Sequence, residues 1–313
     1  MNGKYYSNYN DWWELWKSHR NVITELISKK ILNKFSDINS VAIFGAGYCN
    51  DIDLNFYTEN FDIVTLVDIN EEGMKEGVSR QSLLDENAAK IKYVGGTDFV
   101  GQTDEMYSAF ENLLNSRPSV KKVKKFIINN ANEISKRDIE IKGLEPHSLV
   151  IAVGVHSQLS NLMICLYNHN EINNYFTIKE LREITYEMHY YYGVIAKKFN
   201  DVLLKYTEKA IFLGFDIIEI SERLQNQDEM MFVRNCLENN DLKGLSEFIF
   251  NKDCGVSGAF EGYKDVVDRL SVDKKRYLQF EDEGKIVTNF WNWRFDNKKT
   301  YIIFAKTILK ECF

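Results

Sequence analysis

Long apolar stretches that lack apolar–polar alternation are the sequence feature that most restricts the fold of this chain. SVAIFGAG at 40–47 and FDIVTLVDIN at 61–70 are of this kind, which is typical of strands buried on both faces of a parallel sheet. Further strands are predicted at 90–99, 148–155 and 209–220, and helical patterns at 51–57, 71–88, 103–115, 178–208 and 222–250. Regular alternation of strands and helices predicts a doubly wound α/β fold with a mostly parallel sheet.

The two ends of the chain add to this pattern. KIVTNFWNWRF and KTYIIFAKTIL, near the C-terminus, are two strands joined by a short turn at 296–299, so they must pair as an antiparallel hairpin. An amphipathic helix is predicted over 11–35. We therefore expect an N-terminal helical segment at 1–37 and a Rossmann-like domain at 38–313. Helical insertions or a cap are expected around 103–146 and 160–208, which are too long for ordinary crossovers.

Composition excludes several classes of protein. Hydrophobic residues make up 44% and charged residues 27% of the chain, as in ordinary soluble proteins. The formal charge of −7 disfavours a nucleic-acid partner. The five cysteines form no CxxC pair, so neither a disulfide framework nor a metal site is expected. No signal sequence or membrane-length apolar run is found, which predicts a cytoplasmic protein without a membrane partner. The sequence leaves open whether the chain forms a homodimer.

The first strand ends in a glycine turn, Gly45-Ala-Gly47-Tyr-Cys, followed by Asn50 and Asp51. In doubly wound sheets a ligand binds beyond the carboxyl ends of the strands, where a side chain would block its approach to the backbone. A dinucleotide fingerprint requires a third glycine where Asn50 stands. A carboxylate at Asp51 would repel a pyrophosphate, whereas it suits the amino group and sulfonium of S-adenosylmethionine (SAM).

Two carboxylates follow the next strands. Asp68 ends the second strand, where it can accept hydrogen bonds from ribose hydroxyls. The alternative is that Asp68 caps the following helix. Asp98 follows the third strand, where it could bind an adenine amino group or simply form a turn. The residues beside these carboxylates, Ile69, Thr97 and Phe99, are included in the predicted cofactor site.

Over roughly residues 38–312 the chain resembles class I SAM-dependent methyltransferases. The resemblance is carried by VAIFGAG, VTLVD, GGTD, VIAVGVH and the closing hairpin FWNWRFDNKKTYIIF. It implies SAM as cofactor and places Gly154, Val155 and His156 at the reaction centre. The chain departs from the family pattern at Ile43, where an acidic residue is usual, and at Cys49, where a third glycine is usual. These departures put in doubt how the amino-acid end of SAM is held.

His156 is the candidate general base, because it follows a strand at the catalytic edge and its ordinary pKa lies near neutrality. The alternative is a histidine that only fixes the turn after the strand. Trp12, Trp13 and Trp16 are interpreted either as anchors of the N-terminal helix or as a lid over the site.

The leading hypothesis is an enzyme that transfers the SAM methyl group, by direct in-line displacement, to a small molecule or peptide. The alternatives are a SAM-binding protein that does not methylate and, with less support, an NAD-dependent oxidoreductase. Hydrolase and kinase motifs are absent from the sequence.

Overall fold

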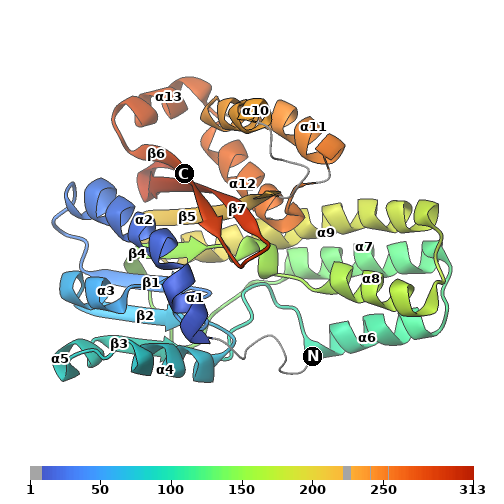
Figure 1. The fold of residues 1–313 in the computed structure, drawn as a ribbon, viewed down its shortest axis with the longest axis horizontal. Coiled ribbons are helices and arrows are strands. Elements are labelled where there is room, and N and C mark those ends of the chain that lie inside the picture. The colour runs from blue at the N-terminus through green and yellow to red at the C-terminus, as the bar shows by residue number, and fades with distance from the viewer. Residues whose placement is uncertain (1–8, 221–226, 240, 253) are drawn as a thin grey trace.

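A computed structural model describes residues 9–220, 227–239, 241–252 and 254–313 (Figure 1). Its centre is a seven-stranded sheet in the order β3-β2-β1-β4-β5-β7-β6. The strands are β1 Ser40–Phe44, β2 Ile63–Val67, β3 Ile91–Val94, β4 His147–Val153, β5 Thr207–Ile220, β6 Ile286–Arg294 and β7 Thr300–Leu309. The first five strands are parallel, and β7 is antiparallel to both β5 and β6. The predicted fold class is confirmed.

The direction of strand addition reverses between β1 and β4. From β1 the chain adds β2 and then β3 on one side, and β4 and then β5 on the other. Phe44 of β1 is level with Val67 of β2 and with Ala152 of β4, so the three strands end at the same edge. This edge is the topological switch point at which doubly wound sheets bind their ligands.

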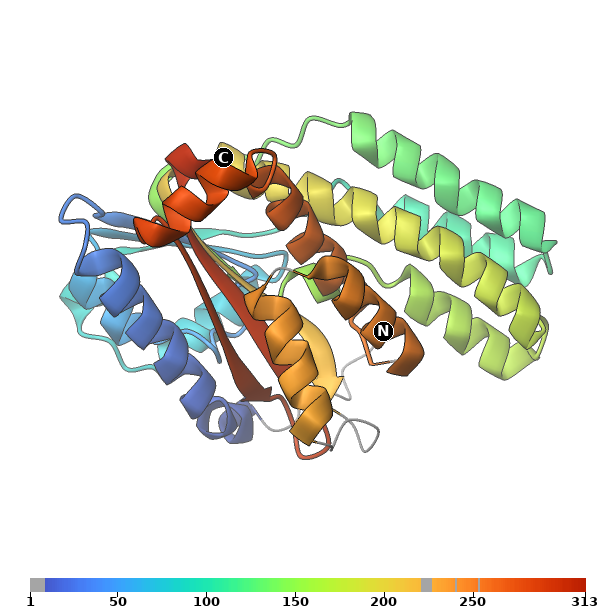
Figure 2. The ribbon, with the colours of Figure 1, turned by 90° about the horizontal axis from the view of Figure 1, so that it is seen from above.

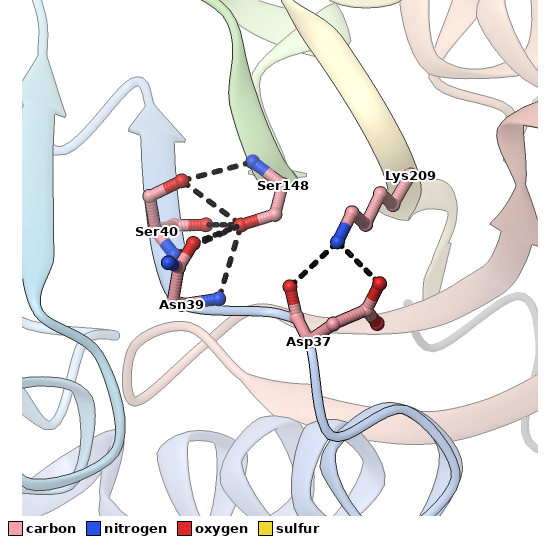
Figure 3. A network of polar contacts seen from close by, with 5 residues as sticks. All are labelled: Asp37, Asn39, Ser40, Ser148 and Lys209. Atoms are coloured by element: carbon pink, nitrogen blue, oxygen red, sulfur yellow. Dashed lines mark hydrogen bonds and ion pairs between the residues drawn. The ribbon is translucent and has the colours of Figure 1, made fainter.

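The opposite edge of the sheet is fastened by side chains (Figure 3). The Ser40 and Ser148 hydroxyls lie 2.9 Å apart, and each serine's backbone N–H donates to the hydroxyl of the other. Asn39 joins this pair through its backbone N–H, and Lys209 at the start of β5 binds Asp37. These contacts join the amino ends of β1, β4 and β5, which leaves their carboxyl ends to form the site.

Helices cover both faces of the sheet (Figures 1 and 2). The helices are α1 Tyr9–Leu15, α2 Lys17–Ile27, η1 Ser28–Leu32, α3 Leu54–Asn60, α4 Glu71–Arg80, α5 Asp85–Ala88, α6 Asp104–Asn115, α7 Val120–Lys136, η2 His156–Gln158, α8 Leu162–Asn173, α9 Ile178–Lys205, α10 Gln227–Glu238, α11 Leu242–Lys252, α12 Ser257–Leu270, α13 Lys274–Asp282 and η4 Lys310–Cys312. One apolar cluster joins α2, η1 and α3 to one face of the sheet, and a larger one joins α6–α9, α12 and α13 to the other face. In Figure 2, α7, α8 and α9 extend well beyond the sheet.

Helix boundaries differ from the predicted ones for local reasons. The helix predicted at 51–57 begins at Leu54, because the Asp53 side chain accepts a hydrogen bond from the Phe56 N–H and caps it. The helix predicted at 11–35 is divided into α1, α2 and the π-helical turn η1. The pattern at 222–250 is divided into α10 and α11, and its first residues lie outside the described part of the chain. Helices α12 and α13 were not predicted. In the described ranges, no helix has the length and apolarity needed to span a membrane.

Candidate active site

The glycine turn after β1 has three residues in the left-handed region at alternate positions. The φ angles are 73° at Gly45, 49° at Gly47 and 54° at Cys49. Cys49 therefore adopts, at a cost, the backbone conformation that a third glycine would adopt freely. A Cβ on Gly45 would lie 2.5 Å from Cγ2 of Val155, so Gly45 also lets the end of β4 pack against the turn. The departure at Cys49 alters the residue but not the shape of the turn.

The turn is held by α4, which sequence reasoning did not include in the site. The Arg80 guanidinium donates to the Tyr48 carbonyl at 2.7 Å. The Gln81 side-chain amide donates to the carbonyls of Cys49 at 3.2 Å and Ile52 at 2.9 Å. A Cβ on Gly77 would lie 2.3 Å from the Tyr48 carbonyl oxygen. The signal in the sequence was Gly77 itself, because a glycine inside a helix destabilises the helix and often marks a close approach.

We expect Gly77→Ala to destabilise the fold by about 1–3 kcal/mol, because the added methyl overlaps a backbone oxygen that cannot move without the turn. Gly193→Ala in α9 is the matched control, since its nearest contact would be an ordinary 3.4 Å to Glu261. That change should raise stability by about 0.5–1 kcal/mol, as alanine favours helices. Urea unfolding of both variants checks the prediction, and equal behaviour would contradict it.

The Asp68 carboxylate connects the ends of β1 and β2. One oxygen accepts the Gly47 N–H at 2.9 Å and the other accepts the Asn70 N–H at 2.8 Å. Burial raises the pKa of Asp68, and the N–H groups of Asn70 and Gly47 counteract this. The N-cap of α4 is Asn70, whose side chain accepts the Gly73 N–H, so the alternative that Asp68 caps this helix is wrong. Each oxygen keeps a lone pair for a ligand hydroxyl.

The end of β3 lies beside Asp68, since the Thr97 N–H donates to the Asp68 carbonyl at 3.3 Å. Asp98 accepts the Val100 N–H through Oδ1, while its buried Oδ2 has no hydrogen-bond partner among the described residues. Burial raises the pKa of Asp98. Ile69 is 69% exposed and directly follows Asp68, so its side chain is free to cover a flat ring bound at this edge. Phe99 instead packs into the core.

Asn50 and Asp51 lie where α2 meets the glycine turn. A small cavity there is lined by Gly45, Asp51 and Ile23 of α2, together with Ile43, Phe44, Ile52, Tyr57, Ile151 and Val153. The Arg20 guanidinium donates to the Asn50 carbonyl at 2.6 Å and is itself buried. Burial raises the pKa of Asp51 to about 7, although its own backbone N–H and Arg20 oppose this. The Asn50 Oδ1 is buried without a partner in the described chain.

His156 is turned into the helical layer. It is 1% exposed and packs against the rings of Phe199 and Phe215. The Asn200 side-chain amide donates to Gly262 and Asp265, so its oxygen accepts from Nε2 of His156 at 2.8 Å. Burial lowers the pKa of His156 to about 4. This is the position of a histidine that fixes the turn, and the predicted general-base role gains no support from it.

The N-terminal helices dock on the closing hairpin through aromatic rings. The Trp16 indole N–H donates to the Phe295 carbonyl at 2.7 Å, and Trp12 stacks on Trp16. The Trp13 ring lies under the Arg20 guanidinium, 3.4 Å away. Trp293 contacts Trp16 edge-on, and it lies over Gly154, where an added Cβ would be 3.3 Å from the indole. Trp12 and Trp16 are anchors, as one alternative expected, and the cluster borders the end of β4.

Comparisons with known proteins gave structural matches alone. No family model matches the chain, and no curated protein matches its sequence. The solved structures that it resembles include a magnesium protoporphyrin IX methyltransferase from Synechocystis PCC 6803 with bound S-adenosylhomocysteine, at 10% identity and a TM-score of 0.42, covering 96% of this chain and 95% of that one. A SAM-dependent methyltransferase from Thiobacillus denitrificans, also in complex with S-adenosylhomocysteine, matches at 9% identity and a TM-score of 0.35, covering 93% of this chain and 90% of that one.

A putative O-methyltransferase from Nostoc punctiforme matches at 10% identity and a TM-score of 0.39, covering 96% of this chain and 58% of that one. Similarities this low concern the fold, not the activity. The strand order, with β7 inserted antiparallel between β5 and β6, is the stronger observation. It confirms the predicted resemblance to class I SAM-dependent methyltransferases at the level of the fold.

Proposed function

We propose that this chain is a SAM-dependent methyltransferase that acts on a small molecule or peptide by direct in-line methyl transfer. One observation carries the proposal. At the carboxyl end of β1 a turn of three left-handed residues donates a backbone N–H to the Asp68 carboxylate at the end of β2. This arrangement places a carboxylate that can accept hydrogen bonds from ribose hydroxyls next to the backbone of the glycine turn, at the switch point of the sheet.

The site residues divide among the parts of the co-substrate. Asp68 would bind the ribose hydroxyls. Ile69 would cover the adenine, whose amino group would donate to the unpartnered Oδ2 of Asp98. The amino-acid end would lie towards Asp51 and the buried, unpartnered oxygen of Asn50. SAM supplies an electrophilic methyl group on a sulfonium, and the residues of the chain position that group and exclude water.

An NAD-dependent oxidoreductase is disfavoured by charge at the same place. Dinucleotide-binding sheets place the pyrophosphate at the N-terminus of the first crossover helix. Here Asp53 caps that helix, α3, and Asp51 lines the cavity next to the glycine turn. Two carboxylates at this position oppose a pyrophosphate but attract an ammonium group.

A paired thermal-shift measurement tests the proposed function. We expect SAM and S-adenosylhomocysteine to raise the melting temperature, because a ligand that binds the folded state stabilises it. NADH should produce no shift. A shift with NADH and none with SAM would overturn the proposal. Formation of S-adenosylhomocysteine from SAM, in the presence of a crude metabolite pool, distinguishes a methyltransferase from a protein that only binds SAM.

Asp51→Asn should weaken S-adenosylhomocysteine binding about tenfold, the usual effect of losing one charged hydrogen bond. Methylthioadenosine, which lacks the amino-acid end, should bind wild type and variant equally. Because the pKa of Asp51 lies at about 7, the carboxylate is ionised above that pH. Wild-type affinity for S-adenosylhomocysteine should therefore fall as the pH drops through this value. Titration calorimetry with both ligands checks this, and a loss of methylthioadenosine binding as well would disprove the assignment.

A further inference from the structure

Asp216 is a buried carboxylate that the proposed SAM site does not use. It lies on β5, two residues beyond Gly214, which pairs with Val153 at the end of β4. Asp216 is 5% exposed, and its Oδ1 has no hydrogen-bond partner in the described part of the chain. A buried carboxylate oxygen without a partner is costly, so such groups call for an explanation.

The local backbone directs this side chain to one face of the sheet. Asp216 pairs with Ile303 of β7, but Ile218 pairs with the next residue, Ile302, so Ile217 forms a β-bulge. Bulges re-aim side chains and are common next to active sites. Asp216 therefore shares a face with Ile303, which packs in the aromatic cluster of Trp16 and Trp293 beneath α1 and α2. The carboxylate lies beside the end of β4, next to this cluster.

Two buried donors beside this cluster also lack partners within the described ranges. The Trp293 indole N–H is buried with no partner among the described residues. His19 of α2 stacks on Trp293, with ring centroids 4.3 Å apart. Because Nδ1 of His19 accepts the Trp291 N–H, its Nε2 carries the hydrogen, and this second donor is likewise buried and unpaired. Among the described residues, Oδ1 of Asp216 is thus an unsatisfied acceptor on this face of the sheet, and Nε1 of Trp293 and Nε2 of His19 are two unsatisfied donors.

We infer that Asp216 is the general base of an O-methyl transfer and that the acceptor is an aromatic hydroxyl compound, an inference that rests on the proposed function. A hydroxyl has one hydrogen to donate to Asp216 and two lone pairs. One lone pair can accept an indole or imidazole N–H while the other attacks. An ammonium group offers no lone pair, and a carboxylate would be repelled by Asp216. Tyr301, which interacts with Asp216, and the tryptophans that pack on Ile303, the partner of Asp216 on β7, favour an aromatic carrier of the hydroxyl.

The transfer balances without a further reactant. A lone pair of the hydroxyl oxygen forms the new bond to the sulfonium methyl carbon of SAM. The carbon–sulfur bond breaks with its electrons passing to sulfur, which leaves S-adenosylhomocysteine. The hydroxyl proton passes to Oδ1 of Asp216, from which it returns to solvent after product release.

The groups around Asp216 allow it to act as a base near neutrality. Burial raises the pKa of Asp216 to about 6, while the neighbouring Ser157 hydroxyl lowers it. Of the titratable groups on this face, Tyr301 of β7 interacts with both Asp216 and Glu219, and His19 of α2 stacks on Trp293. Burial, Glu219 and Asp216 together raise the pKa of Tyr301, which therefore stays protonated. Burial and Arg20 lower the pKa of His19 to about 3, so it stays neutral.

The test uses two probes and the full chain saturated with S-adenosylhomocysteine. The probes are p-cresol and its methyl ether, p-methylanisole, which has no hydroxyl hydrogen. We expect wild type to bind p-cresol about tenfold more tightly than the ether, and Asp216→Asn to lose that preference while its affinity for S-adenosylhomocysteine is unchanged. The preference of the wild type should disappear as the pH falls through about 6, where Asp216 becomes protonated. Glu219→Gln on the same strand is the control and should behave as wild type.

The outcomes separate the two proposals. If S-adenosylhomocysteine does not bind the wild type, the proposed function fails. If it binds but the wild type shows no preference for p-cresol over the ether, or Asp216→Asn keeps that preference, the inference about Asp216 is wrong.

The melting temperature gives a readout that does not depend on the acceptor. A catalytic Asp216 costs stability at pH values above its pKa, so Asp216→Asn should melt higher than wild type at about pH 8. A lower melting temperature would show a structural role.

Discussion

Replacing Asp68 with alanine is expected to weaken SAM binding by about 100-fold or more. A carboxylate that accepts from two ribose hydroxyls contributes about 1.5–3 kcal/mol for each charge-assisted hydrogen bond. The variant also loses the bonds from the N–H groups of Gly47 and Asn70, so the glycine turn is released from β2. Both effects lower affinity, and titration calorimetry with S-adenosylhomocysteine measures their sum.

The matched control is Asp62→Ala, at the other end of the same strand. Asp62 is exposed and lies next to β2 at the edge opposite the site. Its replacement should leave SAM affinity unchanged. Asp68→Asn separates charge from shape, because it keeps one acceptor oxygen and should lose less affinity than Asp68→Ala. Since burial raises the pKa of Asp68, wild-type affinity should fall as acid protonates it. If Asp68→Ala bound as tightly as Asp62→Ala, the ribose assignment would be abandoned.

Gly45→Ala is expected to cost about 2–5 kcal/mol of folding stability and to abolish SAM binding under ordinary assay conditions. The residue has a φ of 73°, where a side chain is strained, and the added Cβ would lie 2.5 Å from Val155. Relief of that overlap would move either the turn or the end of β4. Both carry proposed contacts of the co-substrate.

Gly143→Ala separates strain from overlap. Gly143 has a φ of 83°, but nothing lies within 4 Å of the Cβ position, so alanine there suffers strain alone. The excess loss at Gly45 therefore measures its contact with Val155. The double variant Gly45→Ala with Val155→Ala should recover part of this excess loss of stability. Urea unfolding of wild type, the two single variants and the double variant gives the coupling free energy between the two residues. Equal losses at Gly45 and Gly143 would contradict the packing account.

Part of the site could be predicted because it depends on residues close in sequence. Gly45, Gly47 and Asp68 lie at the ends of consecutive strands, and parallel neighbours bring such ends to one edge. The shape of the turn at Cys49 could not be predicted, because it is imposed by α4 through Arg80, Gln81 and the close approach at Gly77. His156 was placed on the correct strand end, but its direction depends on Asn200, which is distant in sequence.

The sequence alone determined the doubly wound, mostly parallel sheet, because a run that is apolar on both faces must be covered by helices on both sides. It also determined the closing antiparallel hairpin, since two strands joined by a tight turn have no other way to pair. The tertiary structure decided which side chains face the site. The bulge at Ile217 places Asp216 on the face of the sheet that carries Ile303, and the docking of α2 on β6 stacks His19 on Trp293 over the same face. Contacts between residues far apart in the chain leave no periodicity in its sequence, so packing alone reveals them.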